Sequence, residues 1–193
     1  QNISAVGRMK FHPSDNSFQT ENDMTKRRKR VVIAIDFDNI FSYLKKRNKV
    51  FDYAGFVLEI RKKFGFEIDA LRIFAPYDSY RDIPENANGL GYIIEICQKM
   101  DHPDENVWKR EDKVDSYMYM SLRNFIEYPQ ITHVVILSND KHSKELLTQS
   151  ILKDKDVIYF ADKNEMNVEI LDIIDKFKIP VYPLPSKDKQ RFI

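Results

Sequence analysis

The sequence predicts a three-layer α/β/α fold with a mostly parallel central sheet. Two observations carry this prediction: apolar runs rich in β-branched residues recur along the chain, and amphipathic helical patterns lie between them. Strands that alternate with helices are joined by right-handed crossovers, which place helices on both faces of the sheet. With 193 residues, of which 42% are apolar, the chain is long enough to bury one such core.

The predicted strands are the most apolar segments of the chain. The first begins at Val31 and reads VVIAID, a continuous run typical of a strand buried on both faces. Three more runs of this kind are ALRIFA at 70–75, THVVILS at 132–138 and VIYFA at 157–161. IPVYPL at 179–184 predicts a last strand, which its prolines restrict to an edge of the sheet.

Helical periodicity fills the segments between these strands. The predicted helices are 40–48, a stripe from Phe56 to Phe64 that ends near Gly65, a helix around 84–99, 114–127, 143–152 and 168–177. Residues 31–184 therefore form one predicted domain, with a polar and basic arm at 1–30 and a tail at 185–193.

The basic charge of the chain is concentrated in the arm. The net charge is +1, but residues 1–30 carry +4 and the rest carries −3. The peak is the run Lys26, Arg27, Arg28, Lys29 and Arg30, which can pair with the phosphates of RNA or serve as a nuclear address. The alternative is a solvated basic segment that flanks the first strand. The arm is also a candidate device for docking a protein partner or a second copy of the chain.

Several classes of protein do not fit the sequence. Cys97 is the only cysteine, which excludes a disulfide framework and a thiolate zinc site and favours an intracellular compartment, without distinguishing cytoplasm, nucleus and organelle. No apolar run has the length of a membrane span, so no membrane partner is expected. The absence of a Gly-x-Ser-x-Gly elbow and of a glycine-rich phosphate loop argues against serine hydrolases, kinases and nucleotide-cofactor enzymes.

Acidic residues follow two of the predicted strands. The first strand ends in Asp36-Phe37-Asp38-Asn39, and the run at 132–138 leads into Ser138-Asn139-Asp140. Because the carboxyl ends of parallel strands share one edge of the sheet, these side chains are expected to converge there, and Asp115 joins them if its helix begins at that edge. Converging carboxylates need a cation, and hard oxygen ligands suit Mg²⁺ or Mn²⁺. Helix capping is the structural alternative for Asp38, Asn39, Asp115 and Asp140.

In this order, the motifs resemble the NYN domain, a branch of the PIN-like nucleases, over residues 31–184. Asp36 and Asn39 match the family's Asp-x-x-Asn element at the end of the first strand, with Asp38 as the acid often found between them. The segment Lys113-Val114-Asp115 matches a Lys-x-Val-Asp element. Ser138 and Asp140 match two positions of a Ser-Gly-Asp-x-Asp-Phe element.

The resemblance implies a metal-dependent ribonuclease. In that interpretation Asp36, Asp115 and Asp140 hold Mg²⁺ or Mn²⁺, with Asp38 as a further acid or a helix cap, and the ion activates water for attack on an RNA phosphate. Asn39 orients the water or a phosphate oxygen, and Ser138 and His142 contact the substrate. The basic run at 26–30 attracts RNA without reading its sequence.

Two alternatives remain open because the chain departs from the family pattern. Asn139, His142 and Ser143 replace the family's glycine, second aspartate and phenylalanine, and Ser121 stands where a further acid is common. One alternative is therefore a catalytically reduced domain that binds RNA or assembles with a protein. The other is a phosphatase of the haloacid dehalogenase type, with Asp36 as nucleophile, Lys153 or Lys155 as its lysine and Asp162 as a late metal ligand.

Overall fold

The computed structural model describes residues 29–97, 99–101, 110–112 and 114–189. A six-stranded sheet runs through its centre, and every neighbouring pair of strands in it is parallel. The strands, in spatial order, are β4 (Ile93–Cys97), β3 (Glu67–Pro76), β1 (Arg30–Asp36), β7 (Ile131–Leu137), β8 (Asp156–Phe160) and β9 (Val181–Tyr182). The predicted three-layer α/β/α architecture is confirmed.

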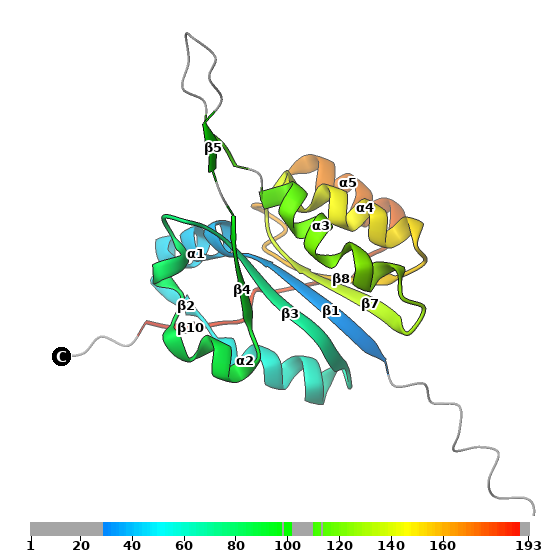
Figure 1. Cartoon of the computed structure of the whole chain (residues 1–193), viewed down its shortest axis with the longest axis horizontal. Helices are drawn as coiled ribbons and strands as arrows, with labels where there is room; N and C mark the ends of the chain where they lie inside the picture. Colours follow the sequence, from blue (N-terminus) through cyan, green and yellow to red (C-terminus); the bar gives the residue numbers. More distant parts are fainter. Residues whose placement is uncertain (1–28, 98, 102–109, 113, 190–193) are drawn as a thin grey trace, which may run out of the picture.

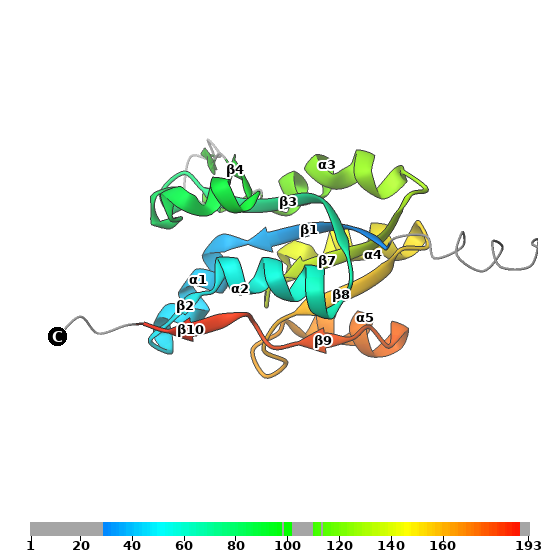
Figure 2. The same cartoon turned by 90° about the horizontal axis from the view of Figure 1, so that it is seen from below.

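Helices cover both faces of this sheet. The longer helices are α1 (Phe37–Lys46), α2 (Tyr53–Leu58), which continues as the π-helical turn η1 (Glu59–Lys63), α3 (Val114–Glu127), α4 (Lys144–Leu152) and α5 (Val168–Phe177). Figure 1 shows α3, α4 and α5 grouped on one side of the sheet, whereas α1 and α2 lie on the other. Figure 2, seen from below, shows the strands following one another from β4 at the top to β9 at the bottom, with α2 drawn across them.

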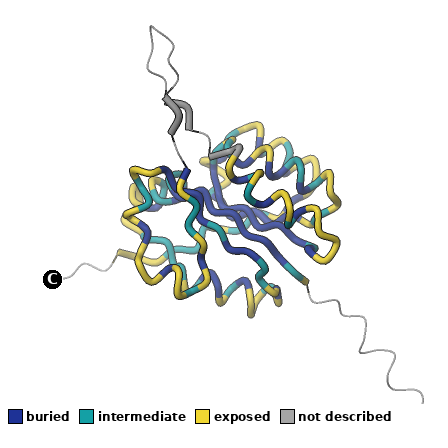
Figure 3. Tube along the Cα trace, viewed as in Figure 1, coloured by how far each residue is buried: buried dark blue, intermediate teal, exposed yellow. Residues whose placement is uncertain are grey.

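The alternating side chains of β1 explain why two layers of helices are needed. Val32 and Ala34 pack into the core under α3, α4 and α5, and Val31, Ile33 and Ile35 pack into the core under α1 and α2. All five are buried. In Figure 3 the strands form the buried centre, and the exposed positions lie on the outer sides of the helices. A strand that is apolar on both faces is stable only when both are covered.

The predicted helix around 84–99 is wrong. A 3-10 helix, η3 (Glu85–Leu90), ends at Gly91 with φ of +93°, and Ile93–Cys97 then forms β4, which pairs with β3. Another 3-10 helix, η2 (Tyr80–Asp82), precedes it. The isoleucines at 93, 94 and 96 are β-branched and favour a strand, but so short an apolar run has no clear period.

The structure also contains short strands that the sequence pattern does not predict. β2 (Lys49–Phe51) pairs with β10 (Ser186–Asp188), and β5 (Lys99–Asp101) pairs with β6 (Arg110–Asp112). The tail predicted from residue 185 is therefore shorter than expected, because residues 186–188 belong to the folded domain. None of the helices within the described ranges has the length and apolarity needed to cross a bilayer.

The order of the strands defines where a ligand site is expected. From β1 the chain proceeds to β3 and β4 on one side, and it then returns to build β7, β8 and β9 on the other side. The strand order reverses between β1 and β7. In open α/β sheets, ligands bind outside the carboxyl ends of the strands at such a switch point.

Candidate functional site

Asp36 lies at the carboxyl end of β1, at the switch point of the sheet. Its side chain is buried, and Ser138 Oγ, at the end of β7, donates a hydrogen bond of 2.9 Å to its Oδ2. Burial raises the pKa of the Asp36 carboxyl to about 7, although the Ser138 hydroxyl and His142 act in the opposite direction. Asp36 is therefore a carboxyl group whose negative charge is poorly solvated, the kind of group that a bound cation stabilises.

Asn39 links the start of α1 to the loop after β7. Its Oδ1 accepts a hydrogen bond of 2.8 Å from the backbone N–H of Asn139. Since α1 begins at Phe37, Asp38 and Asn39 lie inside its first turn, and the capping role considered for them does not apply. Its Oδ1 keeps a second lone pair, and its amide NH₂ offers donors to a ligand.

Asn139 connects the ends of the strands. It is buried, and its Oδ1 accepts a hydrogen bond of 2.8 Å from the backbone N–H of Asp162, which follows β8. Its carbonyl oxygen accepts another of 2.8 Å from the N–H of Asn167, before α5. Asn139 thus fixes the loop after β7 against the loop after β8.

Asp140 has a structural role as well as a position at the site. It precedes the 3-10 helix η4 (Lys141–Ser143), and its Oδ1 accepts a hydrogen bond of 2.6 Å from the N–H of Lys141. Its other oxygen lies 3.7 Å from Nδ1 of His142. Capping and ligand binding are compatible, because each carboxylate oxygen has more than one lone pair.

These residues line one open pocket of about 390 Å³, here called the acidic pocket. Its carboxylates are Asp36, Asp38, Asp140 and Glu165. The remaining lining residues are Asn39, Ser42, Tyr43, Lys46, Arg47, Asn139 and His142. Acids therefore outnumber lysine and arginine side chains at the end of β1.

The donor set of the acidic pocket fits a small hard cation. Among the described side chains, no group of three or more acids, histidines or cysteines converges to hold a metal by itself. Mg²⁺, however, is commonly bound through one or two carboxylates and keeps several of its waters. Asp36, Asp38 and Asp140 provide oxygen ligands of that type in one pocket.

Asp115 is the second residue of α3, and its side chain lies outside the described part of the structure. Its helix ends shortly before β7 begins and packs against η4, so the first turn of α3 lies at the carboxyl edge of the sheet. The sequence predicts Asp115 near the other acids if its helix begins at this edge, and the helix does begin there.

Some of the other predicted site residues lie away from the acidic pocket, and the rest lie outside the described residues. Lys26, Arg27 and Arg28 are outside the described residues. Lys29 and Arg30 lie at the amino end of β1, at the opposite edge of the sheet, and Arg30 pairs with Asp69. Ser121 bonds to Arg72 and Glu95 and does not line the acidic pocket.

Two residues that line the acidic pocket, Tyr43 and Arg47, are not among the predicted site residues. Tyr43 on α1 and Arg47, which directly follows α1, continue from Asn39 in steps of four residues, and this helical spacing is the signal that could identify them. Arg47 also lies 2.9 Å from Glu165, a residue of the loop after β8 that no motif indicates.

No protein-family model and no curated protein matches the chain. A solved structure of a protein of unknown function from Vibrio parahaemolyticus is similar, with a TM-score of 0.63 and 15% sequence identity. The similarity covers 82% of this chain and 94% of that one. At this identity the likeness shows that the two proteins share a fold.

Proposed function

We propose that this chain is a metal-dependent ribonuclease that hydrolyses RNA phosphodiesters in the acidic pocket. The observation that carries the proposal is the gathering of Asp36, Asp38, Asn39 and Asp140 in one pocket at the switch point of a parallel sheet. The resemblance of the same residues to the NYN motifs supports it independently of their position. RNA and the divalent ion are both parts of the proposal.

The residues of the pocket have distinct roles in this proposal. Asp36 and Asp140 hold Mg²⁺ or Mn²⁺ directly or through water, with Asp38 nearby and Asp115 as the ligand expected from α3. The chemistry that such an ion supplies when bound is activation of water and neutralisation of charge on the phosphate. In this proposal the Asn39 amide and His142, which line the pocket, donate to phosphate oxygens. Lys46 and Arg47 provide positive charge on the pocket wall.

Hydrolysis of single-stranded and structured RNA in the presence of Mn²⁺ tests this proposal. We expect cleavage by the wild type, loss of cleavage with a chelator, and at least a hundredfold lower rate for Asp36→Asn, because the buried ligand is neutralised. Asp175→Asn is the matched control, since Asp175 is exposed on α5. Equal rates for wild type and Asp36→Asn would rule out this site as the source of the activity.

A catalytically reduced domain is the second candidate, and the surroundings of Ser121 favour it. Where the family often has another acid, the Ser121 hydroxyl donates to Glu95 at 3.3 Å and contacts Arg72. These three side chains bond to one another, and Ser121 does not line the acidic pocket. Binding of RNA without uptake of Mn²⁺ would support this candidate over the nuclease.

The phosphatase alternative receives little support from the lysines it requires. Lys155 Nζ donates to the carbonyl oxygens of Tyr128 and Ile131 at the amino edge of the sheet. Lys153 follows the last turn of α4 at that same edge. Neither lysine is at the carboxyl edge of the sheet, where Asp36 lies.

A further inference from the structure

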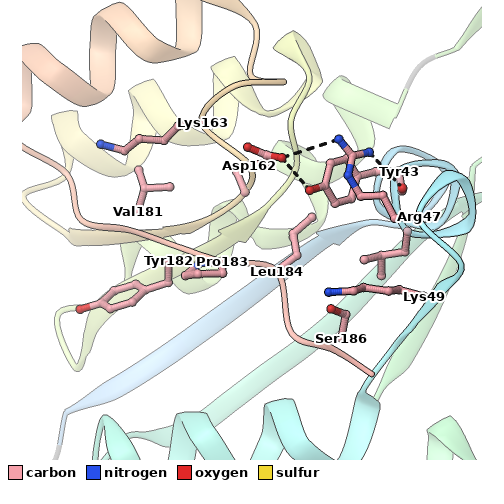
Figure 4. Close-up of a pocket in the computed structure, with 12 residues that line it drawn as sticks. Tyr43, Arg47, Lys49, Asp162, Lys163, Val181, Tyr182, Pro183, Leu184 and Ser186 are labelled. Carbon is pink, nitrogen blue, oxygen red and sulfur yellow. Dashed lines mark hydrogen bonds and ion pairs between the residues drawn. The ribbon is translucent and has the colours of Figure 1, made fainter. Parts of the chain in front are cut away.

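A second cavity, of about 360 Å³, lies beside the acidic pocket and is drawn in Figure 4. Leu44, Val181, Pro183 and Leu184 give it an apolar lining. It lies against the segment that leads from β9 to β10, and in Figure 4 the Leu184 side chain points toward Tyr43, Arg47 and Asp162. Since Tyr43 and Arg47 also line the acidic pocket, the two cavities share a wall.

Contacts with one another and with two acidic residues hold Tyr43 and Arg47, the shared wall, in place. The Arg47 guanidinium lies over the Tyr43 ring, 3.8 Å from its centroid. Arg47 Nη2 is 2.9 Å from Glu165 and 3.8 Å from Asp162, and the Tyr43 hydroxyl donates to Asp162 at 2.7 Å. The wall therefore fixes the Arg47 guanidinium, together with its two carboxylate partners, between the acids of one cavity and the apolar lining of the other.

Two lysine side chains add positive charge to the second cavity. Lys49 and Lys163 line the second cavity, and within the described ranges neither forms an ion pair. Lys49 also lines a third cavity of about 420 Å³, which contains Phe41, Phe51 and Tyr53. A polyanion that places one phosphate in the acidic pocket thus meets cations and apolar surfaces as it continues around α1.

We propose that the second cavity is a subsite for one unpaired nucleoside, next to the phosphate that lies in the acidic pocket. This inference rests on the proposed function and adds a path for the substrate. Arg47 pairs with the phosphate at the boundary, the base packs on the apolar lining, and Lys49 attracts the following phosphate. A cavity of about 360 Å³ is at the small end of the range of ligand sites, ~300–1,000 Å³. It suits a single base, which must be unstacked to enter.

Binding of a short fluorescein-labelled RNA, followed by anisotropy in chelator so that no cleavage occurs, tests the subsite. Leu184→Trp fills the cavity and Lys49→Glu reverses its charge, and each should weaken binding about tenfold. Leu58→Trp and Lys62→Glu are matched controls at exposed positions outside the cavity, and they should bind as the wild type does. Photo-cross-linking of thiouridine-containing RNA should label the segment 181–186.

The outcomes separate this inference from the proposed function. Cleavage that depends on Asp36, together with wild-type RNA binding by Leu184→Trp and Lys49→Glu, would overturn the subsite and leave the nuclease standing. Cross-links at 181–186 without any hydrolysis in Mn²⁺ would support the subsite and contradict the nuclease. Equal affinity for a duplex of the same sequence, or cross-links outside 181–186, would also overturn the subsite.

Discussion

At the scale of single residues, the site depends on a carboxyl group that the fold places at a cost. Asp36 is the last residue of a strand that is buried on both faces, so its side chain is buried on folding along with the apolar side chains of the strand. The Ser138 hydroxyl supplies one hydrogen bond, but burial dominates and raises the pKa to about 7. Structural needs alone would favour a neutral residue here, and this conflict is typical of functional positions.

We expect Asp36→Asn to stabilise the protein at pH 8 in buffer without divalent ions. The folded-state pKa is raised from 3.8 to about 7, so the stability that protonated Asp36 contributes is full below about pH 4 and is lost as the pH rises through 7. Asparagine is neutral throughout. The gain in the free energy of unfolding should be on the order of 1–3 kcal/mol at pH 8 and near zero at pH 4.

Chemical denaturation at both pH values measures this difference. Asp175→Asn, which changes an exposed carboxylate, should leave the free energy of unfolding within about 0.5 kcal/mol of the wild type at each pH. A variant of Asp36 that is less stable than the wild type at pH 8 would show that the ionised carboxylate stabilises the fold.

At the scale of elements, the loops after β1, β7 and β8 form the site as a connected unit. Asn39 on α1 accepts from the backbone of Asn139, and Asn139 accepts from the backbone of Asp162. Through Tyr43, α1 also bonds to Asp162 itself. The amide side chains thus align strand ends that belong to different crossovers.

Asn139→Ala should destabilise the protein by about 1–3 kcal/mol, because the backbone N–H of Asp162 loses its acceptor in a partly buried setting. Urea denaturation measures the change. Asn164→Ala, at an exposed position of the neighbouring loop, is the control and should change stability by less than about 0.5 kcal/mol. Equal effects of the two substitutions would mean that Asn139 does not connect the loops.

The amino edge of the sheet contains a titratable residue that is independent of the site. His133 in β7 is buried with its ring 4.5 Å from that of Phe66, and burial lowers its pKa, although Asp156 acts in the opposite direction. The unfolded state therefore binds a proton first as the pH falls below about 6.5, and the stability that neutral His133 contributes is lost in that range.

Replacement by a side chain that does not titrate should remove this part of the pH dependence. The free energy of unfolding of the wild type, measured relative to His133→Asn, should be greatest above pH 7 and should decrease between pH 6.5 and 5. Comparison with the variant cancels the contribution of Asp36, which has the opposite sign. A difference that does not change with pH would show that His133 titrates alike in the folded and unfolded chain.

At the scale of the whole molecule, the sequence predicts the elements whose patterns are long or continuous. The buried strand beginning at Val31 and the helix at 114–127 are found where their patterns indicate. β4 escapes prediction because its few isoleucines have no measurable period, and β2 and β10 because they are only three residues long. Whether an element can be predicted therefore depends more on the length of its sequence pattern than on its residue types.

The candidate site follows the same logic. Asp36, Asn39, Ser138 and Asp140 come together because a general rule places the ends of parallel strands at one edge. Arg47, Asp162 and Glu165 meet only through the three-dimensional arrangement of α1 and the loop after β8. No local motif contains that information, and these residues are the ones that connect the acidic pocket to the second cavity.

Titration calorimetry with Mn²⁺ tests the central claim, that the acidic pocket binds a divalent ion, most directly. The wild type should take up one ion per chain, Asp36→Asn should bind at least tenfold more weakly, and Asp175→Asn should behave as the wild type. Uptake of Mn²⁺ that is the same in the wild type and in Asp36→Asn, or no uptake at millimolar Mn²⁺, would contradict the claim.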